Sequence, residues 1–99
     1  MTFSEDILKK IRELCLQNGV KSLDAFGSVT RSDFHNESDI DLLVDFNEQD
    51  PIRYTDLYFT LKEQLEALLN RQIDLVEARS VRNSFFKKEL EKTKFSIYG

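Results

Sequence analysis

The chain has 99 residues, with 14 lysines and arginines against 18 aspartates and glutamates, so its formal net charge is −4. Its composition, 40% hydrophobic and 32% charged, predicts a modest core and one domain over residues 1–99. The acidic balance disfavours strong nonspecific binding to nucleic acid. Because the chain has no N-terminal signal region and no apolar run that could span a bilayer, we expect a cytoplasmic protein outside the membrane.

The chain opens with an amphipathic helix. Its apolar residues recur at helical spacing from near Ser4 to just before Gly19, where glycine favours a stop. Thr2 and Glu5 resemble a capping box at its start. The single cysteine, Cys15, falls on the apolar side, which predicts a buried structural thiol.

Two strands follow, predicted from Val20 to Phe26 and from Asp39 to Phe46. Successive side chains of a strand point to opposite faces, so the second strand has an apolar face made of Ile40, Leu42, Val44 and Phe46. Asp39, Asp41 and Asp45 share the other face with Leu43. The backbones of Asp39 and Asp41 lie roughly 6–7 Å apart, which lets their carboxylates converge on a divalent cation. Asp45 is farther along, and we expect it to be solvated or to play a supporting role.

The second half of the chain predicts two further helices and a strand. The residues from Thr55 to Asn70 are predicted to form a helix with a stripe of leucines on one side. Phe59 lies opposite that stripe, where it is either an anchor for a partner protein or a scattered surface residue. A strand from Ile73 to Glu77 follows, and then a helix that Ser80 caps and that runs through about Thr93. Residues 95–98 dock as an extended tail or remain mobile. The expected fold is α/β (α+β), a small mixed β-sheet flanked by helices.

A glycine turn and a third carboxylate add chemistry to this frame. Gly27 and Ser28 follow the first strand directly, where glycine lets a phosphate approach the backbone. Arg31 offers a planar donor fork suited to phosphate, with a surface arginine as the alternative. Asp74 lies in a second alternating acidic strand, whereas His35 is expected to be an exposed loop residue. An acidic strand alone is most often a solvated face, but this combination favours a site for metal and triphosphate.

The motif Gly27-Ser28, followed after ten residues by Asp39-Ile40-Asp41 and later by Asp74, resembles the signature of the DNA polymerase beta-like nucleotidyltransferase superfamily. The fit through Gly-Ser-Val-Thr-Arg and Ser-Asp-Ile-Asp-Leu-Leu-Val-Asp-Phe more narrowly resembles the minimal nucleotidyltransferases, short proteins often paired with a helical HEPN-domain toxin. One departure is Ser32, where such proteins usually have glycine. The resemblance implies the nucleotidyltransferase fold and magnesium-dependent transfer of AMP from ATP to a hydroxyl of the toxin, an antitoxin role.

The resemblance also implies roles for single residues. Two Mg²⁺ ions would be held by the catalytic and metal-binding set, Asp39, Asp41 and Asp74, with the last completing the metal nearest the attacking hydroxyl or serving as its general base. The β- and γ-phosphates of the nucleoside triphosphate would be contacted by Gly27, Ser28 and Arg31.

Two other functions stay open. The chain could be a catalytically silent antitoxin that neutralises its partner by binding, or it could transfer nucleotides to RNA or to a small molecule such as an antibiotic. The full set of motif residues favours the enzyme, since a pure binder has no chemical need for it, and the acidic balance weakens the RNA hypothesis. A homo- or hetero-oligomer is compatible with each of these functions.

Overall fold

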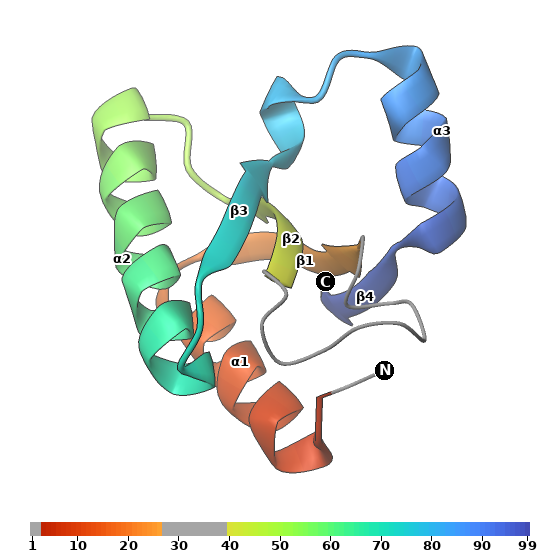
Figure 1. The fold of residues 1–99 in the computed structure, drawn as a ribbon. Helices are drawn as coiled ribbons and strands as arrows, with labels where there is room; N and C mark the ends of the chain where they lie inside the picture. The colour runs from red at the N-terminus through yellow and green to blue at the C-terminus, as the bar shows by residue number, and fades with distance from the viewer. Residues whose placement is uncertain (1–2, 27–39) are drawn as a thin grey trace.

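The structure, a computed structural model, describes residues 3–26 and 40–99 (Figure 1). In chain order its elements are α1 (Glu5–Gln17), β1 (Val20–Phe26), β2 (Ile40–Phe46), α2 (Pro51–Leu69), β3 (Ile73–Glu77), the 3₁₀ turn η2 (Ala78–Ser80), α3 (Ser84–Thr93) and β4 (Phe95–Tyr98). This confirms the predicted α+β fold with a mixed sheet. None of the helices in the described residues is long and apolar enough to cross a membrane.

The sheet has the strand order β3-β2-β1-β4. β1 runs antiparallel to both β2 and β4, whereas β2 and β3 are parallel and are connected through α2. Figure 1 shows α1 and α2 together on one side of the sheet and α3 on the other. The predicted apolar face of β2 packs against α1 and α2 in a core that also contains the fully buried side chains of Ile11, Leu61 and Leu65.

The first helix begins near Ser4, as predicted, whereas the second begins earlier than predicted. The cap of α1 is Ser4 rather than the predicted Thr2, because the Ser4 hydroxyl accepts the Ile7 N–H at 3.2 Å. The second helix begins at Pro51, so the predicted start at Thr55 is wrong. The Asp50 carboxylate caps this helix, and proline suits a first turn because its missing N–H would have no helical partner there.

The last helix begins at Ser84, so the prediction that Ser80 caps it is wrong. Asn83 is its cap, and the Asn83 Oδ1 atom accepts the Phe86 N–H at 3.0 Å. Ser80 belongs to η2, where its hydroxyl donates to the Glu77 carbonyl at 2.8 Å. Both candidates are ordinary capping residues, so composition alone did not distinguish them.

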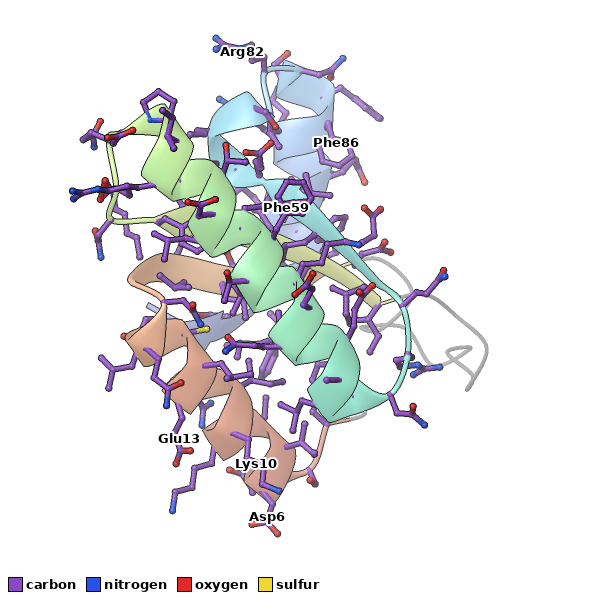
Figure 2. All side chains as sticks on the ribbon, turned by 90° about the vertical axis from the view of Figure 1, so that its left-hand side faces the viewer. Asp6, Lys10, Glu13, Phe59, Arg82 and Phe86 are labelled. Carbon is purple, nitrogen blue, oxygen red and sulfur yellow. The ribbon has the colours of Figure 1, made fainter. Side chains whose placement is uncertain are left out.

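Three further predictions concern single features of the chain. Residues 95–98 dock in extended form as β4 beside β1. Cys15 is fully buried, as predicted. Burial raises the pKa of its thiol to about 12, which disfavours the thiolate that a nucleophile needs. Phe59 is 56% exposed on α2 (Figure 2), with its ring edge-on to Tyr58 at a centroid distance of 5.1 Å, so its role as a partner anchor stays a prediction.

Two side chains of α2 bind the backbone of the edge strand β3. Glu66 Oε2 accepts the Ile73 N–H at 3.1 Å, and the Tyr58 hydroxyl donates to the Leu75 carbonyl. These two backbone groups lie on either side of Asp74 and point away from β2. The pair therefore satisfies edge groups that would otherwise be unpaired and holds the segment that carries Asp74.

The Glu66 contact predicts a pH-dependent stability. The Ile73 N–H and, to a lesser degree, the Lys62 ammonium lower the pKa of Glu66. The stabilisation is therefore present above the carboxyl's unfolded pKa and is lost as the pH falls through the depressed folded pKa. Glu66→Gln should lower the free energy of unfolding at neutral pH, and the difference from wild type should shrink toward about pH 3. Urea unfolding across this range, with exposed Glu63→Gln as the control, measures the effect; a difference independent of pH would contradict it.

Candidate active site

A row of three side chains crosses the sheet on the face that α3 shares. Phe26 of β1 is the register partner of Asp41 in β2, and Asp41 is the partner of Asp74 in β3. Residues directly opposite each other in neighbouring strands point to the same face. The structure thus brings together two of the three predicted carboxylates.

The geometry of Asp41 and Asp74 suits a shared cation. Neighbouring strands lie about 4.8 Å apart, so two carboxylates in one row can both reach an ion that binds oxygen at about 2.1 Å. Asp41 is half-buried and Asp74 is exposed, which leaves the row open to solvent and ligand.

The other predicted site residues lie outside the described residues. These are Gly27, Ser28, Arg31 and Asp39, together with His35, which the sequence predicts to be an exposed loop residue. Within residues 3–26 and 40–99, no three His, Cys, Asp or Glu side chains gather into a metal-binding group. The predicted metal set needs Asp39, which immediately precedes β2.

Asp45, on the same face of β2 as Asp41, has a structural partner. Its Oδ1 atom accepts from Arg79 Nη2 at 2.8 Å and from Arg79 Nε at 3.2 Å. The Arg79 guanidinium also lies 4.1 Å from the centroid of the Tyr54 ring. Asp45 therefore joins β2 to η2 and α2, a role that its place in the strand did not reveal.

A groove of about 600 Å³ separates α3 from the sheet beside this row. Its sheet wall includes Asp24 of β1 and Leu43 of β2, which are register partners. The wall formed by α3 and its C-cap carries Lys87, Lys88, Lys92 and Lys94, together with Glu91, which pairs with Lys94 at 2.9 Å. Asp24 is only 9% exposed, and burial raises its pKa, opposed by the charge of Lys94.

Sequence reasoning missed Asp24 and Phe86 on this face. Asp24 alternates with Ser22 and Phe26 along β1, and this pattern could have placed it on the face of β1 opposite Leu23 and Ala25. Phe86 meets the Phe26 ring edge-on at a centroid distance of 6.3 Å, a contact between distant segments that no local pattern signals.

Solved structures share this fold. A protein described provisionally as a minimal nucleotidyltransferase superposes with a TM-score of 0.73 at 28% identity, over 89% of this chain and 86% of its own. A toxin-antitoxin structure with AMP-PNP gives 0.71 at 25% identity, over 93% of this chain and 73% of the other. The complex of a tri-AMPylated Shewanella oneidensis HEPN toxin with its MNT antitoxin gives 0.66 at 22% identity, over 96% and 71%.

Sequence relatives agree with the fold. A Methanocaldococcus jannaschii protein provisionally named protein adenylyltransferase MJ1379 is 37% identical over 93 residues, 91% of this chain and 92% of its own. The protein adenylyltransferase MntA of Thermococcus cleftensis is 37% identical over 76 residues, 77% of this chain and 74% of its own. The family profile "Polymerase beta, Nucleotidyltransferase" matches residues 9–99. With that match and the acidic row on its sheet, the chain belongs to the polymerase beta nucleotidyltransferase family.

Proposed function

We propose that this chain transfers AMP from ATP to a hydroxyl group of a helical HEPN-domain toxin and so acts as its antitoxin. The observation that carries the proposal is the register of Asp41 with Asp74 on an open sheet face. The two relatives named as protein adenylyltransferases support the reaction, since each aligns over most of both chains. The structures with AMP-PNP and with an AMPylated HEPN toxin support ATP as the donor and such a toxin as the partner.

Two magnesium ions fit the donor set that we propose. Asp39 and Asp41 would hold them, and Asp74 would complete the ion nearest the acceptor hydroxyl or act as its base. The carboxylates of Asp41 and Asp74 share a row, and carboxylate oxygens are the ligands that Mg²⁺ prefers. Bound magnesium supplies neutralisation of the triphosphate's negative charge.

The triphosphate would be bound by residues that follow β1 in the sequence. Gly27 and Ser28 would offer backbone N–H groups and a hydroxyl to the β- and γ-phosphates, with Arg31 adding charge-assisted contacts. The support for this placement is that β1, which directly precedes Gly27 in the sequence, ends at Phe26, the register partner of Asp41.

The transfer itself is a substitution at the α-phosphorus. The acceptor oxygen forms a bond to that phosphorus, the bond from phosphorus to the oxygen that bridges to the β-phosphate breaks, and pyrophosphate leaves. The hydroxyl proton leaves on the attacking side, where we place Asp74, and its carboxylate can accept the proton directly. Asp41 would help to orient the reacting groups by holding magnesium.

Labelled ATP tests the proposed acceptor. The chain is incubated with α-labelled ATP, magnesium and, in separate reactions, a HEPN toxin, RNA or an aminoglycoside. Label on a toxin hydroxyl is the expected result. Binding and neutralisation of the toxin without label would instead identify a catalytically silent antitoxin, and label on RNA or the antibiotic would assign a different acceptor.

Asp41→Asn should reduce AMP transfer by roughly 100-fold or more, because it removes an anionic ligand from a site for divalent cations. The melting temperature should change little, since Asp41 is half-buried and asparagine has the same shape. Transfer rates and calorimetric binding of AMP-PNP with magnesium are the measurements. Asp56→Asn, the same change at an exposed position on α2, is the control. Unchanged AMP-PNP binding and AMP transfer in the Asp41→Asn variant would contradict the proposed site.

Asp74→Asn should separate chemistry from binding. Because Asp74 is proposed to serve the attacking side, its loss should lower the transfer rate far more than the affinity for AMP-PNP. Single-turnover transfer and calorimetry on the same protein give both values. Equal losses would assign Asp74 to nucleotide binding, and no loss in either would make it an ordinary solvated strand residue.

A further inference from the structure

Two aromatic rings stand beside the acidic row. Phe26 is the register partner of Asp41, and the Phe86 ring lies edge-on to it at an interplanar angle of 81°. Phe86 is 41% exposed, although it lies next to a half-buried phenylalanine. The Phe86 ring therefore keeps solvent-accessible surface while it contacts the side chain that neighbours Asp41 in the sheet.

The backbone of Phe86 is held in place. Its N–H is bound by the Asn83 side chain at 3.0 Å, and the Asn83 carbonyl accepts the Lys87 N–H at 3.0 Å. The ring thus projects from a capped first turn of α3 rather than from a free loop (Figure 2). Because the helix cap fixes its backbone and the Phe26 ring packs against it, the Phe86 ring loses little conformational freedom when a flat ligand stacks on it.

A cavity of about 530 Å³ adjoins Phe86. Val76, Val81 and Phe85 give it apolar surface, and Ser80, Arg82 and Asn83 add polar groups. Val76 is two residues beyond Asp74 on β3, so it shares the face of the acidic row. The volume lies within the range of about 300–1,000 Å³ that is usual for small-ligand sites. Aromatic and apolar surface therefore continues directly from the carboxylates.

We propose that Phe86, held by its perpendicular contact with Phe26, is a stacking platform for the purine base of the nucleotide. This inference rests on the proposed function, which places the triphosphate beside Asp41. A nucleoside triphosphate held there extends its base away from the charged row, and the described surface next to that row offers π-faces. Base-on-aromatic stacking depends on the ring face rather than on edge hydrogen bonds, so the platform favours purines over the smaller pyrimidines and treats adenine and guanine alike.

Nucleotide binding to the full chain tests the platform. In calorimetry with magnesium, Phe86→Ala should raise the Kd of AMP-PNP and of the matching GTP analogue by a similar factor, about 5- to 100-fold. The Kd of the CTP analogue should rise less, and that of inorganic tripolyphosphate should stay constant. Phe86→Tyr should retain binding, whereas Phe86→Leu, which keeps apolar bulk without a π-face, should lose it.

Phe95→Ala is the matched control. Phe95 is 42% exposed, close to the value for Phe86, but it pairs with Ala25, whose side chain lies on the opposite face of β1 from Phe26. Its loss should leave every nucleotide Kd unchanged.

Three results would be decisive. An unchanged Kd for AMP-PNP in folded Phe86→Ala and Phe86→Leu would overturn the platform. An unchanged nucleotide Kd with a raised KM for the toxin would assign Phe86 to the acceptor and would also overturn it. Purine binding that depends on Phe86, without transfer to any acceptor, would support the platform while the proposed transferase function fails.

Discussion

The parallel pairing of β2 with β3 is the constraint on which the candidate site depends. It aligns Asp41 with Asp74 across one strand spacing. Because side chains alternate along a strand, a slip of one residue would turn Asp74 to the face that α1 and α2 cover. Ile73 and Leu75, each 3% exposed, flank Asp74 and bury their side chains in the core. Burial of the flanking residues therefore fixes the position of the carboxylate.

α2 links stability to the site in a second way. Its buried face, with Leu61 and Leu65, packs in the core, and its Tyr58 and Glu66 side chains bind the outer edge of β3. A parallel pair needs a long connection between its strands, and here the connecting helix also covers the edge that the pair leaves. The same helix thus closes the core and positions the strand that carries Asp74.

The two faces of the sheet differ: one packs in the core, and the other carries the acidic row. One is sealed by α1 and α2, whereas the other is covered by α3 across a groove of about 600 Å³. On the open face the acidic row would repel a triphosphate, which is why the proposed chemistry calls for divalent cations there. The lysines of α3 and the aromatic pair Phe26 and Phe86 border the same region, so charge and stacking surface adjoin the row.

The sequence by itself determined the alternation of β2, the buried Cys15, the order of the helices and of the first three strands, and the family, because these depend on local periodicity and on a motif of fixed spacing. The parts that it proposed for residues 27–39 remain predictions. Only the tertiary structure decided the register of Asp74, the edge contacts of Glu66 and the meeting of Phe86 with Phe26. Each of these joins residues from separate elements, and strand pairing and helix packing, rather than any local preference, set the distance between them.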